Sequence, residues 1–213
     1  MSGRIRPYLK ADTEALREIC IRTGAGGEDA RGVEAEPGLL PEIFLDPYLR
    51  HSPAHAFVVE DDAGPCGYAV GVPDSRAFAA WQEAQWWPRL RAAHRDPGPD
   101  RGRWQSSDWL RRWVHCPPEA LPDALAGWPA HGHIDLLPRA QGAGLARPLM
   151  ETLLDSLARA GAPGIHLGVA AGNARALRFY EKLGFVRVPD VGGPGAVFVA
   201  RSLPTAGSAD AGA

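Results

Sequence analysis

The fold of this chain is decided by the stretch Leu136-Leu-Pro-Arg-Ala-Gln-Gly-Ala-Gly-Leu145, which joins a short apolar run to a long amphipathic segment. Gly142 and Gly144 leave the backbone free to turn sharply and to approach a ligand closely. Behind them, leucines recur every four residues over 144–160, which predicts a helix with one buried face. We therefore expect a strand over 132–137, then a glycine turn, then this helix.

The glycine turn is expected to bind an anion. Unpaired backbone amides at the start of the helix, together with the helix dipole, form a site for a group such as a pyrophosphate. Arg139 can add a positive charge. A dinucleotide-binding fingerprint fits poorly because Arg147 occupies its third glycine position, and the Gly-Lys-Ser/Thr ending of a Walker A loop is absent. The alternative is a plain strand-to-helix turn.

A second informative segment reads Asn173-Ala-Arg-Ala-Leu-Arg-Phe-Tyr-Glu-Lys-Leu-Gly-Phe185. Asn173, Ala176 and Tyr180 fall on one face of a predicted helix over 173–183, and Gly184 supplies its left-handed end. Asn173 is the only asparagine in the chain. Taken alone, however, it also suits a helix N-cap, and the tyrosine also suits an ordinary core position.

Together the two segments resemble motifs A and B of the GNAT superfamily of acetyltransferases, R/Q-x-x-G-x-G/A and N-x-x-A-x-x-x-Y-x-x-x-G-F. The resemblance implies an α/β fold, the GNAT fold. This is a mixed six- or seven-stranded sheet with helices on both faces and a central V-shaped opening for acyl-coenzyme A. It also implies acetyl-CoA as co-substrate. The cofactor-binding positions it implies are Leu136, Leu137, Arg139, Gln141, Gly142, Ala143, Gly144, Leu145, Asn173 and Tyr180.

A narrower resemblance extends over most of residues 44–185. Short pieces there are similar to the acetyltransferase-like domain attached to O-GlcNAcase and to its stand-alone bacterial relatives. This similarity raises the alternative of a non-catalytic module that holds acetyl-CoA or a partner protein without turnover. The pieces are Phe57–Asp61, Gly67–Gly71, Trp86–Leu90, His133–Pro138 and His166–Val169.

The resemblance implies an N-acetyltransferase acting on an amine of a small molecule or protein. Such an amine is mostly protonated at pH 7, so the reaction needs a general base, and the departing thiolate gains from a proton donor. Tyr180 is implied as the general acid, because GNAT enzymes commonly use the matching tyrosine. Asp135 is the first candidate for the base and His133, on the same strand face, the second; a buried hydrogen-bonded pair is the alternative. Glu60 and Asp74 are further candidates.

All seven tryptophans lie between Trp81 and Trp128, in a segment over about 75–129 that is interpreted as a helical insertion. They could line an acceptor pocket, stacking on a sugar or an aromatic amine, or form the core of the insertion. His115 and Cys116, with the histidines after residue 130, have no standard ligand spacing, so no metal site is expected.

Hydrophobic periodicity predicts the remaining elements. Further strands are expected over 4–9, 56–60, 66–72, 165–169, 186–188 and 196–200. Further helices are expected to begin at Asp12 or Thr13, at Asp74 or Ser75, and at Ser107 or Asp108, and one is expected over 39–50. The pattern predicts a single domain over 1–203 and a disordered tail over 204–213.

Composition limits the partners. The formal net charge of -2 gives no reason to expect nucleic acid or an anionic membrane. The chain has no apolar signal-peptide region and only three scattered cysteines, so we expect a cytoplasmic protein. The expected partners are acetyl-CoA and an amine acceptor that the sequence does not identify. The resemblance also implies a homodimer, through the C-terminal strands, as one assembly state.

Overall fold

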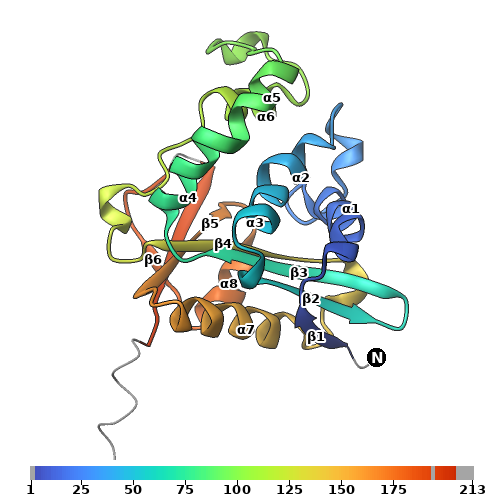
Figure 1. The fold of residues 1–213 in the computed structure, drawn as a ribbon, viewed down its shortest axis with the longest axis vertical. Helices are drawn as coiled ribbons and strands as arrows, with labels where there is room; N and C mark the ends of the chain where they lie inside the picture. The colour runs from blue at the N-terminus through green and yellow to red at the C-terminus, as the bar shows by residue number, and fades with distance from the viewer. Residues whose placement is uncertain (1–2, 193–194, 205–213) are drawn as a thin grey trace, which may run out of the picture.

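The computed structural model describes residues 3–192 and 195–204. A mixed sheet of seven strands runs through the molecule in the order β1-β2-β3-β4-β5-β7-β6 (Figure 1). Among the strands of the described residues, β4 and β5 alone pair in parallel, which confirms the predicted mixed sheet. The strands are β1 (Arg4–Pro7), β2 (Ala56–Asp61), β3 (Gly64–Val72), β4 (Ala130–Leu136), β5 (Gly164–Ala170), β6 (Val186–Val188) and β7 (Ala196–Ser202).

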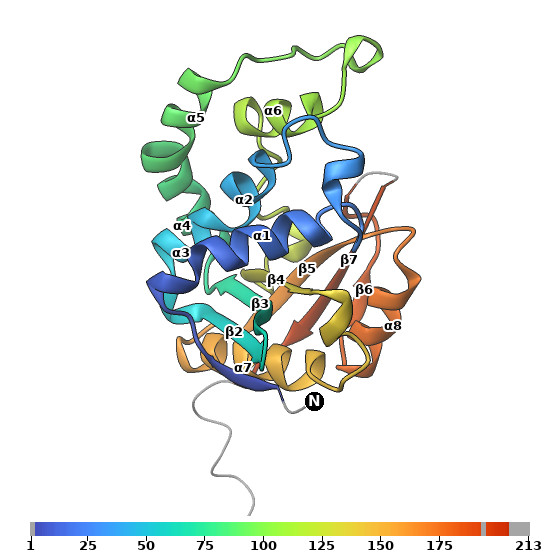
Figure 2. The same ribbon diagram turned by 90° about the vertical axis from the view of Figure 1, so that its right-hand side faces the viewer.

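Helices cover both faces of the sheet, as predicted (Figures 1 and 2). On one face lie α7 (Ala146–Arg159) and α8 (Ala174–Lys182). On the other lie α1 (Thr13–Thr23), α2 (Leu39–Phe44) and α3 (Asp46–His51). Between β3 and β4 the chain adds α4 (Ser75–Trp81), α5 (Trp87–Ala93) and α6 (Asp108–His115), which extend beyond the sheet at the top of Figure 1.

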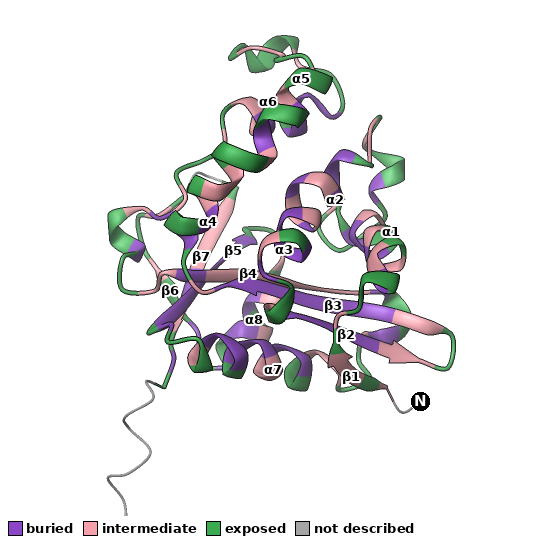
Figure 3. Ribbon diagram, viewed as in Figure 1, coloured by how far each residue is buried: buried purple, intermediate pink, exposed green. Residues whose placement is uncertain are grey.

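Alternation along the central strands creates two cores, one on each face of the sheet. In β3, Tyr68 and Val70 pack with the α1–α6 side, whereas Ala69 between them packs with α7 and α8. The leucine stripe of α7 is fully buried against the second face, as its four-residue spacing predicts. Figure 3 shows this burial along the sheet and the greater exposure of the segment that carries α5 and α6.

Two helices form where the sequence predicts one over 39–50. The backbone breaks at Leu45, whose φ of -127° and ψ of -60° lie outside the helical range. Pro47 explains the break, because its ring would clash with the carbonyl of Ile43 in a continuous helix. Pro88 acts in a similar way near the start of α5, after a π-helical turn over Gln82–Trp86.

The described chain also contains short 3₁₀ helices. They are Lys10–Asp12, Ala30–Gly32, Pro53–His55, Arg101–Arg103, Asp123–Leu125 and Pro138–Ala140. Within the described ranges, no helix has both the length and the apolar character needed to cross a membrane. Except for Pro204, the tail predicted to be disordered lies outside the described residues.

Candidate functional site

The sheet opens at its centre. Of the described strand residues, β4 and β5 are paired only at Ala130–Ile165 and His131–His166, although both strands continue further. Beyond His131 the two strands separate, so their facing edges are free of each other. This is the predicted V-shaped opening, and two pockets meet in it.

The smaller pocket has a volume of about 480 Å³ and lies between β4, β5 and α8. Leu136, Gln141, Asn173 and Tyr180, all predicted from the sequence, line it together. The other predicted positions, Leu137, Arg139 and 142–145, are not among its lining residues. The 142–145 segment instead immediately precedes Ala146, which does line the pocket and begins α7.

The glycine turn has the geometry that the sequence predicts. Gly142 and Gly144 have φ values of 77° and 76°, and the space where a side chain would stand is open at both. It is therefore the left-handed backbone, rather than crowding, that requires glycine here. Within the described residues no side chain caps the start of α7 at Leu145, so the amides of Ala146 and Arg147 stay available to a ligand, while Pro148 has no N–H to offer.

Arg139 does not point toward this pocket. Its Nε donates to Asp61 Oδ2 at 2.9 Å and its Nη2 to the carbonyl of Pro65 at 2.9 Å, which ties the loop to the β2–β3 hairpin. The ion pair lowers the pKa of Asp61. The guanidinium that does line the pocket belongs to Arg175, whose Nη1 donates to Gln141 Oε1. Sequence reasoning missed Arg175, although a basic residue two positions after Asn173 was a usable signal.

Asn173 and Tyr180 combine structural contacts with access to the pocket. Asn173 Oδ1 accepts a hydrogen bond from the amide of Ala176 at 2.9 Å, so this residue caps α8 as well as lining the pocket. Tyr180 packs edge-on against Phe179 and Phe185 and is 7% exposed. Burial, with a smaller effect from the charge of Asp135, raises the pKa of the phenol, so Tyr180 keeps its proton at neutral pH.

Asp135 lies where the two pockets meet. Tyr68 Oη donates to Asp135 Oδ2 at 2.5 Å, and within the described residues no hydrogen bond involves Oδ1. His133 Nε2 is 3.9 Å from Asp135 Oδ2 and is buried without a partner among the described residues. Burial lowers the pKa of His133, so its ring is neutral at pH 7.

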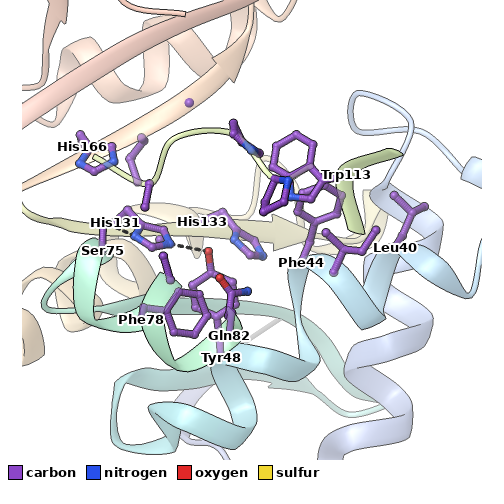
Figure 4. Close-up of a pocket in the computed structure, with 18 of the residues that line it drawn as sticks. Leu40, Phe44, Tyr48, Ser75, Phe78, Gln82, Trp113, His131, His133 and His166 are labelled. Atoms are coloured by element: carbon purple, nitrogen blue, oxygen red, sulfur yellow. Dashed lines mark hydrogen bonds between the residues drawn. The ribbon is translucent and has the colours of Figure 1, made fainter. Parts of the chain in front are cut away.

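The larger pocket has a volume of about 1020 Å³ and lies between the sheet, α1–α3 and the α4–α6 segment (Figure 4). Thr23, His133, Asp135, Gly168 and Ala170 line both pockets. A group in the smaller pocket can therefore reach a group in the larger one through the V-shaped opening. The arrangement suits transfer of a group between two ligands that enter from different sides.

Comparison with known proteins assigns the family. The profile of the acetyltransferase (GNAT) family matches residues 27–185. This chain is a GNAT family member. Over 204 residues, which are 93% of this chain, it is 28% identical to Protein O-GlcNAcase of Rattus norvegicus. The chain spans only 22% of the length of that relative.

Solved structures agree with this assignment. SsHAT superposes with a TM-score of 0.86 at 36% identity, covering 95% of this chain and 98% of SsHAT. The Salmonella typhimurium yncA structure, a putative acetyltransferase with its cofactor acetyl-CoA, has the same fold, with a TM-score of 0.55 at 20% identity and full coverage of both chains. Mycothiol acetyltransferase of Brachybacterium faecium is 52% identical over 48 residues, which are 22% of this GNAT chain and 14% of that enzyme.

The other two candidates for the base in this GNAT site are engaged elsewhere. Glu60 pairs with Arg4 and Arg6 near the β1 edge of the sheet, and these contacts lower its pKa. Asp74 caps α4 through its side chain, which accepts from the amides at 76 and 77. Neither carboxylate lines either pocket.

His131 belongs to a satisfied network in the wall of the larger pocket. Ser75 Oγ donates to the carbonyl of Pro129 at 2.7 Å, so at 2.6 Å it must accept from His131 Nδ1. Tyr48 Oη then donates to His131 Nε2 at 2.8 Å, as drawn in Figure 4. The contacts fix one neutral tautomer, and burial lowers the pKa of His131 to about 3.

The tryptophans divide between the core and the wall of the larger pocket. Trp87 is buried in the core, and Trp81 and Trp86 pack against that core. Trp87, Trp109 and Trp113 also line the larger pocket. In the described part of the chain, no three His, Cys, Asp or Glu side chains gather in a way that could hold a metal ion.

Proposed function

We propose that this chain is an acetyl-CoA-dependent N-acetyltransferase that moves an acetyl group directly to an amine of a small molecule or protein. The observation that carries the proposal is the meeting of two pockets at the split between β4 and β5, with Asp135 in the wall that they share. Family membership supports the acetyl donor, and the second pocket supports a separate acceptor.

Acetyl-CoA fits the smaller pocket by the chemistry of its wall. The free amides at the start of α7, with the 142–145 turn and the guanidinium of Arg175, suit the anionic pyrophosphate. Leu136, Gln141 and Asn173 would contact the remainder of the molecule, and Arg139 would hold the loop against the hairpin. When bound, acetyl-CoA supplies an activated thioester.

Asp135 is proposed as the general base. A lysine-like amine is neutral in only about 1 of 2,500 molecules at pH 7, which costs about 4.6 kcal/mol. Tyr68 holds Asp135 Oδ2, which leaves Oδ1 to take the proton from the ammonium group of the acceptor. His133, which is neutral and adjacent, is the second candidate.

Tyr180 is proposed as the general acid. The neutral amine nitrogen attacks the acetyl carbonyl, the carbon–sulfur bond breaks, and Tyr180 Oη gives its proton to the departing thiolate sulfur. The nitrogen then loses its second proton as the amide forms, and a proton of that kind restores the Tyr180 phenol. Its raised pKa means that the phenol is protonated, and so carries a proton to donate, at neutral pH. The proton that Asp135 has taken returns to solvent after the product leaves.

The test is amine-dependent release of coenzyme A thiol, measured for the wild type and for Tyr180→Phe and Asp135→Asn. The proposal expects turnover by the wild type and a large loss in each variant, with acetyl-CoA binding retained. Binding of acetyl-CoA without turnover on any amine would instead support a non-catalytic module that holds acetyl-CoA or a partner protein. Equal rates for the wild type and Tyr180→Phe would remove Tyr180 as the acid.

A further inference from the structure

The charges around the larger pocket all have one sign. Three carboxylates line it, those of Glu83, Glu119 and Asp135, and no Lys or Arg does. Glu83 is paired with Arg91, whereas Glu119 makes no ion pair within the described residues and Asp135 keeps one oxygen free. The residues outside the described ranges contain no Lys or Arg either. An anionic group in this pocket would therefore meet no lysine or arginine partner.

Aromatic rings form much of the wall. At one end Phe44 meets Trp113 edge-on at 5.1 Å and stacks with Trp109 at 6.2 Å. At the other end lies Phe78, which is 2% exposed, and Trp87, also 2% exposed, is a further lining residue. Figure 4 shows Phe44 and Trp113 on the opposite side of the pocket from Phe78 and His131. The aromatic rings thus line a concave pocket that extends into the protein interior.

We propose that the acceptor is a small primary amine on an aromatic or apolar body, whose only charge is its ammonium group. This inference rests on the proposed function. The ammonium group would approach Asp135 at the V-shaped opening, while the body packs among the rings, which also attract a cation through their faces. The pocket, at about 1020 Å³, is at the upper end of small-molecule sites, so it has room for a bulky body.

The same wall discriminates against acidic amines. A carboxylate or phosphate on the acceptor would enter a pocket whose charged lining residues are all carboxylates, without a lysine or arginine to neutralise it. Amino acids and phosphorylated amino sugars should therefore bind less well than amines of the same size without an acid. This selectivity follows from the pocket alone and does not depend on how the proton is transferred.

The first experiment is calorimetric titration of the full chain, in the presence of coenzyme A, with 2-phenylethylamine and with phenylalanine. The two probes share the same body and differ by one carboxylate. We expect 2-phenylethylamine to bind at least about tenfold more tightly. Acetyl-transfer rates are then measured for both probes, for glucosamine 6-phosphate and for a lysine-containing peptide, and the simple amine should have the highest kcat/KM.

A charge reversal at the rim gives a second readout. Glu119 is exposed in a loop, so Glu119→Arg should leave the fold intact. It should weaken the binding of 2-phenylethylamine. The ratio of the phenylalanine Kd to the 2-phenylethylamine Kd should fall by roughly three- to tenfold. Asp155→Arg is the matched control, because Asp155 is exposed on α7 and lines neither pocket, and it should change neither affinity.

The outcomes separate this inference from the proposed function. Tighter binding of 2-phenylethylamine without turnover supports the inference and overturns the enzymatic function. Preferred acetylation of the peptide, of phenylalanine or of the sugar phosphate overturns the inference and keeps the enzymatic function. Equal binding of the two probes, or no binding of either, also overturns the inference.

Discussion

Tyr180 and Asp135 approach the V-shaped opening from different elements, α8 and β4, and the charge of Asp135 contributes to the raised pKa of the phenol. Phe179 and Phe185 pack against the tyrosine ring, and Tyr68 donates a hydrogen bond to the carboxylate. A proton acceptor and a proton donor held apart in one opening suit a reaction that removes one proton and supplies another.

Replacing Tyr180 by Phe keeps the packing and removes only the proton donor. We expect kcat to fall by about 100-fold, since general acids contribute roughly that much or more. The affinity for acetyl-CoA should change by less than about twofold, because the lost interaction acts at the departing sulfur. Steady-state kinetics with a calorimetric measurement of binding checks both expectations. A parallel loss of acetyl-CoA affinity would instead indicate a binding role for the hydroxyl.

Replacing Asp135 by Asn removes the proposed proton acceptor. The variant would depend on amine that is already neutral, so its kcat/KM should rise about tenfold per pH unit below the amine pKa of about 10.4. At pH 7 it should be at least about 100-fold slower than the wild type. Rate profiles from pH 6 to 9, measured in parallel for His133→Gln, decide between the two candidates. If His133→Gln shows the steep profile and Asp135→Asn does not, histidine is the base.

Some features of the loop and the helix that border the smaller pocket could be predicted from the sequence, and others could not. The glycine turn, the N-cap of Asn173 and the burial of Tyr180 are all local consequences of motif spacing, so they could be predicted. The orientation of the Arg139 side chain could not be predicted, because its partner Asp61 lies in a hairpin far away in the sequence. Arg175 lies only two residues after Asn173, so its position in the sequence was a usable signal, although its place at the pocket also depends on how α8 packs.

Arg175→Gln tests that placement on α8. Loss of one charge-assisted contact to a phosphate group should weaken acetyl-CoA binding roughly tenfold and lower its dependence on salt. Arg178→Gln is the matched control on the same helix, because Arg178 is exposed and lines neither pocket. Calorimetric titrations at low and high ionic strength measure the effect. Equal affinities in the two variants would contradict the assignment of Arg175.

The β3–β4 pair depends on a glycine at 132. A Cβ there would stand 2.3 Å from the carbonyl oxygen of Val70 and 3.0 Å from Gly71 Cα, both in the backbone of β3. Gly132→Ala should therefore lower the free energy of unfolding by about 2–4 kcal/mol. Gly172→Ala, with open space at that position, is the control and should be close to neutral. Urea denaturation measures both, and a neutral Gly132→Ala would show that the strands shift to accommodate the methyl.

At the scale of the whole molecule, sheet architecture could be predicted better than the pocket walls. Strand and helix patterns specify the sheet and its two covered faces. The larger pocket arises from α4–α6 folding back beside α1–α3, a non-local contact that periodicity does not encode. The tryptophans therefore left two interpretations open; Trp87 is buried in the core and also lines the larger pocket, and its contact with an acceptor stays a prediction. The homodimer stays a prediction.

The buried histidine network predicts acid sensitivity. His131 has a pKa of about 3 in the fold and about 6.5 when unfolded, so the unfolded state binds the extra proton. Its contribution to stability is present above pH 6.5 and is lost as the pH falls toward 3, at a cost of up to about 3 kcal/mol by pH 4. Urea denaturation at pH 7, 5.5 and 4 should show this fall. The free energy of unfolding of His131→Gln should fall less over the same pH range. An equal fall in the wild type and in the variant would contradict the low pKa of His131.

Calorimetric titration of the purified chain with acetyl-CoA tests the central claim most directly, with coenzyme A and NAD as controls. Our account predicts saturable binding at one site per chain in the micromolar range, by acetyl-CoA and by coenzyme A, and no binding of NAD. A folded protein that gives no heat with acetyl-CoA would contradict it. The 142–145 turn and the split between β4 and β5 would then be features of the fold without a bound donor.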